Sequence, residues 1–300
     1  MKQKTTPDAF SRSHPAVLLL FFLLALVFGM VLQHPAYIAA GGGTAALYAL
    51  YLSPRRTMRF LLSLLPILLI ITAINPLFTT LGEHPLFFLG ERPYTREALL
   101  CGTSVAGMFG TMALWFFCMS IAVTADKLTA ILAPAAPTLS LLFVMVLHLI
   151  PELRRRTGHI TCARACIGKG APERASLRER IETGGAALLA VMLVSLEGAI
   201  QTADSMRSRG YGAVRRTSFA CLCFTRRDGV LCAALVLCTT LFLRSALTGG
   251  PQTQFFPLDI APVAGAKAVI SLAGYTLLLL LPVLTDIWED LQWHFSISSI

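Results

Sequence analysis

Three residues near the middle of the chain have the types and the spacing of metal ligands. His159, Cys162 and Cys166 would lie on one face of a helix, where residues three and four apart are neighbours. Arg155 and Arg164 crowd the same segment and would repel a divalent cation, and a fourth ligand at a usual zinc spacing is missing. We therefore expect ordinary packing cysteines here, and a chain that binds no metal and no other cofactor.

One short stretch, Gly168-Lys169-Gly170, approaches the sequence of a phosphate-binding loop. Such a loop needs the pattern G-x-x-x-x-G-K-[ST]. Here Ala163 occupies the position of the first glycine, and neither Ser nor Thr follows the lysine. The patterns H-E-x-x-H and G-x-S-x-G, which indicate metal-assisted or serine hydrolysis, are missing as well. The sequence therefore predicts no nucleotide site and no catalytic centre in this chain.

A second stretch, "SMRSRGYG" at residues 205–212, predicts a helix end that binds another protein. An arginine near a helix C-terminus stabilises the helix by roughly 0.3–1 kcal/mol, and glycine is the preferred residue just beyond it. Arg209-Gly210 fits that local explanation. Met206, Arg207 and Tyr211 add apolar, cationic and aromatic groups at the same tip, and this combination suits an acidic or polar groove on a partner.

The elements that position these residues belong to a very apolar chain. Of its 300 residues, 55% are hydrophobic and 14% are charged, whereas a soluble domain has about 25% charged residues. Several apolar runs have the length of roughly twenty residues that a helix needs to cross the hydrocarbon core. The predicted fold class is an all-α, polytopic membrane protein in contact with the lipid bilayer.

Six of the apolar runs are predicted to be transmembrane helices. They cover residues 15–32, 35–52, 60–77, 99–123, 229–247 and 262–282. Basic residues cluster between alternate runs, and the positive-inside rule places those segments and both termini in the cytoplasm. The predicted location is the inner, or cytoplasmic, membrane of a cell. The net charge of +9 then reflects this clustering, and we expect no nucleic-acid partner.

Two further apolar segments, residues 128–150 and 184–203, are predicted to be amphipathic helices on the cytoplasmic side. A full crossing by either one would put a basic segment outside the cell, against the positive-inside rule. Pro134 and Pro137 interrupt the first segment, and Glu197 lies in the second. The expected organisation is four N-terminal spans in residues 1–124, a coupling-helix block in 125–228, and two spans with a short tail in 229–300.

Three motifs, in this order, resemble the transmembrane T component of energy-coupling factor transporters, including the cobalt-type and vitamin-type members. "INPLF" at residues 74–78, followed by Gly82 and Leu89, is similar to the family's "NPLF…G" stretch. "HLIPELRRRTGHITCARACIG" at residues 148–168 resembles its second coupling helix. "ADSMRSRGYG" at residues 203–212, followed by Arg216-Thr217, resembles the end of its third coupling helix.

The resemblance implies a subunit that is not an enzyme. In that family, the T component couples two cytoplasmic ABC ATPases, which bind ATP and magnesium, to a substrate-binding S-type membrane subunit that takes up a vitamin or a transition-metal ion. The family's coupling-helix tips dock into grooves on the ATPases. By position in the motifs, the docking residues of this chain would be Met206, Arg207, Arg209, Gly210, Tyr211, Arg164 and Gly168.

The first of the two tips departs from the family pattern. Counted from Pro151 without a gap, the expected arginine falls on Ile167. Either Arg164, three residues earlier and on a neighbouring part of the helix face, takes over the contact, or this tip docks through apolar packing. We expect Arg164 to take the role, and Arg209 to be the stronger of the two contacts.

Two other functions remain as alternatives at this point. A secondary membrane carrier would act without ATPase partners, but the predicted spans lack the paired intramembrane acids that such carriers often use. A membrane-embedded enzyme would need a catalytic constellation, which the sequence does not offer. The substrate is left open, because the partner subunit binds it in the family that this chain resembles.

Overall fold

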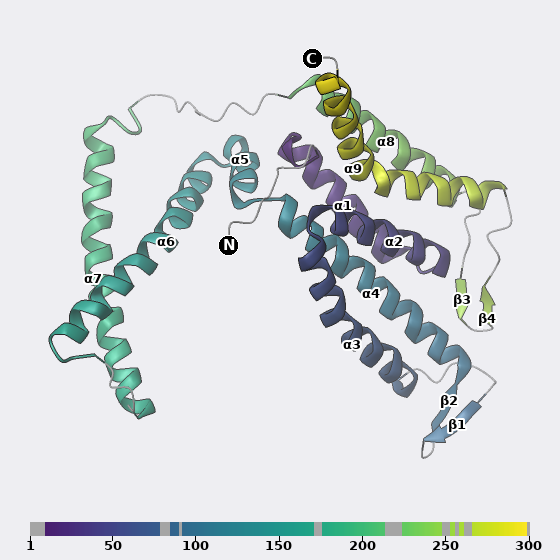
Figure 1. Ribbon diagram of the computed structural model, residues 1–300, viewed down its shortest axis with the longest axis horizontal. Helices are drawn as coiled ribbons and strands as arrows, with labels where there is room; N and C mark the ends of the chain where they lie inside the picture. Colours follow the sequence, from purple (N-terminus) through teal and green to yellow (C-terminus); the bar gives the residue numbers. More distant parts are fainter. Residues whose placement is uncertain are drawn as a thin grey trace. The chain divides into compact units, whose positions relative to one another are not determined.

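The computed structural model describes residues 10–78, 85–89, 92–170, 176–213, 224–247, 253–255, 258–260 and 266–298. In this part of the chain the structure is helical, apart from two short hairpins (Figure 1). The chain divides into two compact units. One unit comprises Met1–Lys127 and Cys223–Ile300, and the other comprises Leu128–Leu222. The expected helical membrane protein is confirmed by these long apolar helices.

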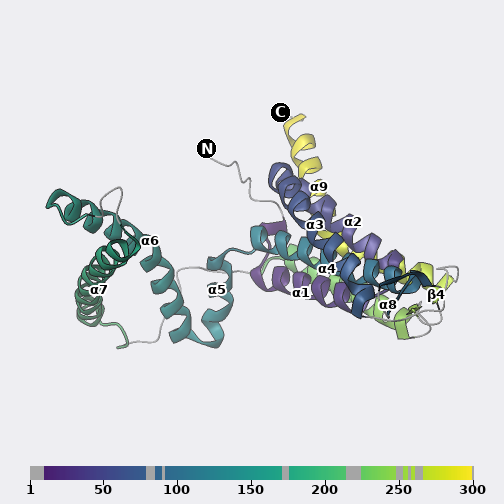
Figure 2. The same ribbon diagram turned by 90° about the horizontal axis from the view of Figure 1, so that it is seen from below.

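The first unit contains six long helices (Figure 1, Figure 2). They are α1 (Pro15–Val31), α2 (Pro35–Leu52), α3 (Pro54–Phe78), α4 (Arg96–Ala122), α8 (Arg226–Leu247) and α9 (Ala266–Ser298). A 3₁₀ turn, Phe10–Arg12, precedes α1. The hairpins are β1 (Pro85–Leu89) with β2 (Arg92–Thr95), and β3 (Thr253–Phe255) with β4 (Leu258–Ile260).

The starts of α1 and α2 follow from the same tripeptide, His-Pro-Ala. In each case the Nδ1 atom of the histidine, His14 or His34, accepts the N–H of the alanine two residues later at 3.2 Å. The proline occupies the first helical position, where its fixed φ fits the helix and its missing N–H is not needed. The starts of both helices are therefore fixed by local chemistry.

The core of this unit is built around Trp115 of α4. Its ring lies edge-to-face with Phe21 of α1 at 5.5 Å and with Phe22 at 6.3 Å, and it stacks on Tyr48 of α2 at 6.3 Å. All four side chains are buried completely. Aromatic pairs with these geometries stabilise a core beyond the contribution of their buried area. Four aromatic residues from three helices thus hold α1, α2 and α4 together.

A stripe of small residues on α4 lets α3 approach closely. Gly102, Ala106 and Gly110 recur at intervals of four residues and are buried. A Cβ atom at Gly102 would lie 2.9 Å from the carbonyl oxygen of Thr72, and one at Gly110 would lie 3.2 Å from Leu68. Membrane helices commonly associate through such small residues, since lipid supplies no hydrophobic force between them.

The polar contact at the start of α8 ties this helix to the N-terminal segment. Asp228 is buried, and its carboxylate accepts the N–H of His14 at 2.8 Å and both the N–H and the hydroxyl of Thr225, at 2.9 and 2.7 Å. Burial alone would raise the pKa of Asp228, but these hydrogen bonds and the nearby His14 hold it below the ordinary value. The ionised form is therefore the one that stabilises the fold.

The second unit is formed by most of α5 (Ala125–Ala135), α6 (Pro137–Cys166) and α7 (Leu177–Ser208). Pro137 stands at the first helical position of α6, which explains the break after α5. The helix then runs for 30 residues and continues through Pro151. α7 has 32 residues and begins with a capping box, in which Ser176 and Glu179 each bond the other's backbone N–H, at 3.3 and 2.9 Å.

The helices that are long and apolar enough to cross a membrane differ from the six predicted spans. In the described residues these are α3, α4, α6, α7 and α9, while α1 is apolar but shorter. Three of them coincide with predicted crossings. α6 and α7 were expected at the membrane surface, yet each contains an 18-residue window as apolar as a span, because that window holds no more than two charged residues. Length and hydropathy alone therefore do not separate α6 and α7 from the transmembrane helices, although the positive-inside rule predicted that they lie at the membrane surface.

We predict that Gly102→Val destabilises the first unit by about 1–3 kcal/mol, since the new side chain would meet the backbone of α3 rather than a flexible group. Thermal unfolding in detergent or nanodiscs measures the effect. Gly43→Val is the control, because a Cβ atom there has no neighbour within 4 Å. Equal melting temperatures for the two variants would contradict the close contact.

We also predict that Asp228→Asn lowers the free energy of unfolding by about 1.5–3 kcal/mol at neutral pH, through the loss of hydrogen bonds to an ionised group. Because the folded pKa lies below the unfolded one, this contribution is present above the unfolded pKa and disappears as pH falls below about 4. The difference between wild type and variant should shrink over that range. Asp204→Asn, at an exposed site on α7, should show no such difference.

Candidate functional site

The tip of α7 has a fixed backbone geometry that follows from its glycine. The N–H of Tyr211 donates to the carbonyl of Met206, and the N–H of Gly210 donates to the carbonyl of Arg207, both at 3.0 Å. Gly210 has a φ of +74°, in the left-handed region. These are the two bonds of a Schellman motif, which satisfies carbonyl groups that a helix end leaves without partners. Arg209 is the C-cap residue, and it is exposed.

The tip of α6 has the same motif. Lys169 donates its N–H to the carbonyl of Arg164 at 2.9 Å, and Gly168 donates to Ala165 at 3.1 Å. Gly168 also has a φ of +74°, and Ile167 is the C-cap residue. At the ends of both α6 and α7, the residues on either side of the glycine therefore adopt the same backbone structure.

The shared motif gives a residue-by-residue equivalence between the tips. Ile167 is equivalent to Arg209, as the ungapped count from the sequence suggested. Arg164 is equivalent to Met206, and both are half-buried. The Nε atom of Arg164 is shut off from solvent and, within the part of the chain that the structure describes, has no hydrogen-bond partner. Arg164 therefore does not occupy the position of Arg209.

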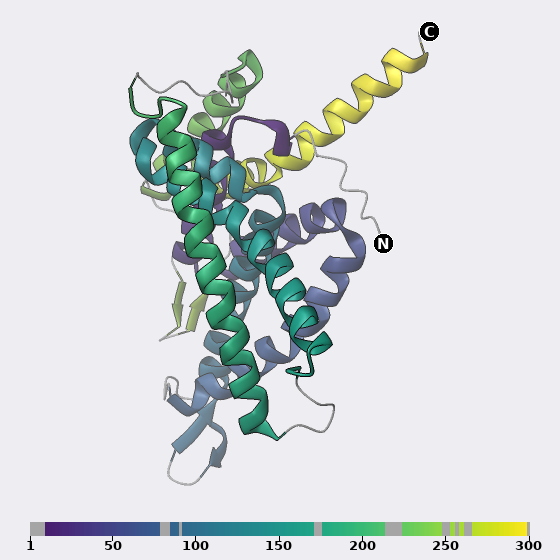
Figure 3. The same cartoon turned by 90° about the vertical axis from the view of Figure 1, so that its left-hand side faces the viewer.

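The two tips lie at opposite ends of the second unit (Figure 3). The end of α6 is followed closely by the start of α7, and α7 then runs for 32 residues. At 1.5 Å per residue this helix is about 48 Å long. Arg209 therefore lies a full helix length away from Leu177, where α7 begins, and one small partner domain would not contact both tips at the same point.

The contact between α6 and α7 is made by small residues and one arginine. The guanidinium of Arg156 in α6 donates to the carbonyl of Val194 in α7 at 3.3 Å, and to Glu152 in its own helix at 2.9 Å. A Cβ atom at Gly198 would lie 3.3 Å from the same guanidinium. Ala187 and Val191 of α7 are also buried. The face of α7 with the smaller side chains therefore turns toward α6.

The other face of α7 carries large apolar side chains that are more than half exposed. These residues are Leu188, Leu189, Met192, Leu193, Leu196 and Ile200. Of the most apolar window of α7, 11% is buried, and of that of α6, 6% is buried, compared with 39% for α4. Such faces require lipid or another protein to cover them.

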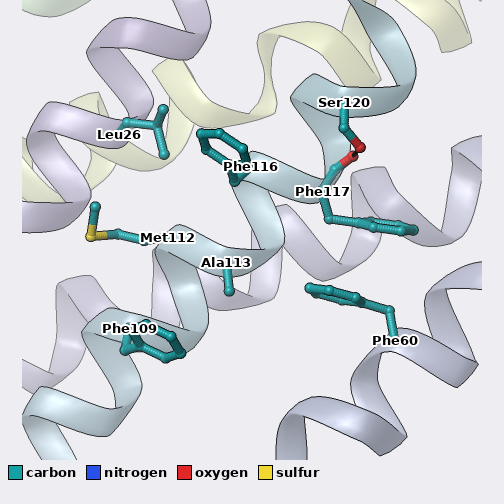
Figure 4. Close-up of a pocket in the computed structure, with 8 residues that line it drawn as sticks. All are labelled: Leu26, Phe60, Phe109, Met112, Ala113, Phe116, Phe117 and Ser120. Atoms are coloured by element: carbon teal, nitrogen blue, oxygen red, sulfur yellow. Dashed lines mark hydrogen bonds between the residues drawn. The ribbon is translucent and has the colours of Figure 1, made fainter. Parts of the chain in front are cut away.

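An apolar groove lies on the first unit (Figure 4). It has a volume of about 440 Å³ and is lined by Leu26 of α1, Phe60 of α3 and several residues of α4. Phe60 stacks on Phe117 at 4.6 Å, and Phe116 is largely exposed. The only polar side chain in the lining, Ser120, donates to the carbonyl of Phe117. This groove suits an acyl chain or an apolar side chain, and it offers no charged group to an ionic solute.

The remaining sequence motifs fall partly within the described residues. "INPLF" forms the end of α3, where Asn75 lies against Gly102 of α4, with 3.0 Å between the Cβ atom of Asn75 and one built at Gly102. Leu89 ends β1. Gly82 and the pair Arg216-Thr217 lie outside the described residues.

His159, Cys162 and Cys166, whose spacing was considered for a metal site and set aside, all lie on α6. Cys162 and Cys166 are free and exposed on α6. Across the described ranges, no group of three or more His, Cys, Asp or Glu side chains has the geometry to hold a metal ion.

Comparison with protein-family models and with curated proteins found no match for this chain.

A set of contacts that the spacing of residues did not reveal holds the segment before α1. Lys127 of α5 donates to the carbonyls of Ser11 and Ala122, at 2.5 and 2.7 Å, and the buried Asp286 of α9 accepts the N–H of Phe10 at 2.9 Å. An isolated lysine between two apolar runs and an aspartate beyond the last predicted span were the available signals. Ser11 and Phe10 lie more than a hundred residues away from Lys127 and Asp286 in the chain, so spacing did not reveal these two contacts.

We predict that Gly210→Ala loosens the tip of α7. An alanine at this φ costs roughly 1–2 kcal/mol, so hydrogen exchange at the amide of Tyr211 should become about 5–30 times faster. Mass spectrometry of the exchanged protein measures this rate.

Gly185→Ala is the matched control for that variant, since it lies inside α7 with no neighbour within 4 Å of a Cβ atom. Gly210→Asn should lie between wild type and Gly210→Ala, because asparagine tolerates the left-handed region. An unchanged exchange rate in Gly210→Ala would contradict the cap geometry described above.

Proposed function

We propose that this chain is the non-catalytic membrane coupling subunit of an ATP-driven uptake system of the energy-coupling factor type. It would link ATP hydrolysis by two cytoplasmic ABC ATPase subunits to the movement of a separate, substrate-binding S-type membrane subunit. The observation that carries the proposal is the pair of helix tips. α6 and α7 end in the same cap motif, at opposite ends of one unit, with the C-cap side chains exposed.

The electrostatics of the tips favour a protein groove over a nucleotide. A helix C-terminus carries the negative end of the helix dipole, which disfavours a phosphate group. Arg207 and Arg209 are exposed there, next to Tyr211, which is 51% exposed. Arginine forms bidentate pairs with carboxylates, and Arg and Tyr are frequent anchors of protein interfaces. The tips would therefore dock into the ATPases, and ATP with its magnesium ion would be bound by those partners.

The separation of the tips supports two docking sites. With α7 about 48 Å long, one tip would contact one ATPase and the second tip would contact the other. When the two ATPases close on ATP, the distance between the docking sites would change, and the crossed helices would have to pivot about their contact at Arg156 and Val194. Small residues at that contact allow the helices to slide with little steric resistance.

The large apolar faces of α6 and α7 would pass the motion on. Their exposed leucine and methionine side chains offer a flexible apolar surface, which suits a membrane subunit embedded in the same bilayer. The apolar groove of the first unit suits a lipid chain. The substrate, a vitamin or a transition-metal ion, would be bound by the S-type subunit. The chain would lie in the inner, or cytoplasmic, membrane with both termini in the cytoplasm.

A secondary carrier is the alternative function. It would need ionisable groups that alternate between protonated and ionised states along a pathway. The buried Asp228 and Asp286 instead accept hydrogen bonds from the backbone of the N-terminal segment. This engagement favours a structural role for both carboxylates. Transport by the purified chain alone, without ATPases, would support the carrier.

We predict that Arg209→Glu weakens the association of the two ATPases with this chain by at least about tenfold, since reversing the charge in a desolvated ion pair costs several kcal/mol. The measurement is co-purification of the ATPases with the tagged chain, together with the ATPase activity of the complex. Both should fall.

The control for this variant is Arg178→Glu, which makes the same charge change at an exposed position in the first turn of α7. It should leave the association unchanged. Equal ATPase recovery with wild type and Arg209→Glu would rule out docking through this tip. If the wild-type chain itself brings down no ATPase, the proposed function is wrong.

A further inference from the structure

The two helix tips have the same backbone but opposite chemistry. The C-cap position is occupied by Arg209 in α7 and by Ile167 in α6. From this difference we infer that the two tips dock by different interactions: α7 places a cation in an acidic groove, whereas α6 inserts Ile167 into an apolar pocket of its ATPase. The inference rests on the proposed function and specifies the chemistry of the partner surface at each site.

The equivalence of the two positions is geometric. Gly168 and Gly210 share a φ of +74°, and each is followed by a residue whose N–H closes the longer bond of the same motif. The C-cap side chain therefore leaves each helix from the same place in the cap. Ile167 is 68% exposed, and Arg209 is exposed as well. An exposed isoleucine at the foremost position of a long helix gains free energy when a partner removes it from water.

Arg164 is poorly placed to restore the missing charge. It lies three residues before Ile167, about 4.5 Å further back along the helix axis. It is half-buried, and its equivalent in α7 is the apolar Met206. Its Nε atom is inaccessible to solvent. Of the side chains of Arg164 and Ile167, that of Ile167 lies nearer the end of α6 and is the more exposed.

Lys169 is the cation that remains near this tip. It is exposed and stands in the position that Tyr211 occupies in α7, one residue beyond the glycine. Lysine carries a compact, strongly hydrated charge on a flexible stem, so it can remain in water at the rim of an apolar pocket. We therefore assign Lys169 to the rim and Ile167 to the pocket.

Replacing Ile167 by arginine should change ATPase binding in opposite directions, depending on whether the groove that receives α6 is apolar or acidic. If the pocket is apolar, Ile167→Arg buries an unpaired charge and weakens ATPase association by at least about tenfold. If the groove is acidic, like the one proposed for α7, the same change restores the missing arginine and strengthens association. The measurement is ATPase binding to the full chain in nanodiscs.

Salt dependence separates the contributions of the two tips. Between about 0.1 M and about 1 M salt the screening length falls from about 10 Å to about 3 Å, which weakens exposed ion pairs and leaves apolar contacts intact. When Arg207 and Arg209 are both replaced by alanine, the binding that remains comes from α6 and should change little over this range. Lys169→Ala should change it less than twofold. Residual binding that is lost at high salt would overturn the apolar pocket.

Ile181→Arg is the matched control for Ile167→Arg. Ile181 is 73% exposed and lies near the other end of α7 from Arg209. This variant should bind the ATPases like wild type. Stronger or unchanged ATPase binding by Ile167→Arg would contradict the apolar pocket but not the proposed function. Absence of ATPase binding by the wild-type chain would contradict the proposed function, on which the inference depends.

Discussion

The carbonyl groups at the end of a helix must find hydrogen-bond partners, and the candidate site depends on how this chain meets that requirement. At both α6 and α7 a glycine in the left-handed region closes the same pair of hydrogen bonds. The cap stops the helix at a defined residue and orients the side chain before the glycine. Arg209 and Ile167 are therefore presented by rigid structures rather than by loops.

A second constraint acts on the faces of the helices. In a membrane, helices approach one another where their residues are small, because lipid covers large apolar side chains as well as protein does. α4 follows this rule with Gly102 and Gly110 against α3, and α7 follows it with Ala187 and Gly198 toward α6. The large side chains of α7 face outward. The same division leaves the large apolar face of α7 open to lipid or to another protein.

Local features of this fold were predictable from the sequence, whereas long-range ones were not. The cap at Gly210, the helical class and the alignment of Ile167 with Arg209 depend on neighbouring residues, and spacing reveals them. The hydrogen bond from Lys127 to the carbonyl of Ser11 depends on tertiary packing, which spacing within one sequence does not reveal. The number of transmembrane helices could not be predicted from the sequence either, because α6 and α7 are apolar enough to lie in a membrane or in a protein interface.

We propose that the tip of α7 contacts an ATPase, and a photoreactive benzophenone amino acid at position 211 can capture this contact when it is incorporated in cells that contain the whole transport system. Irradiation should join this chain to an ATPase subunit, identified by mass spectrometry of the product, and a probe at position 185 within α7 should not. Products at position 211 that contain only lipid, or no product at all, would contradict the account.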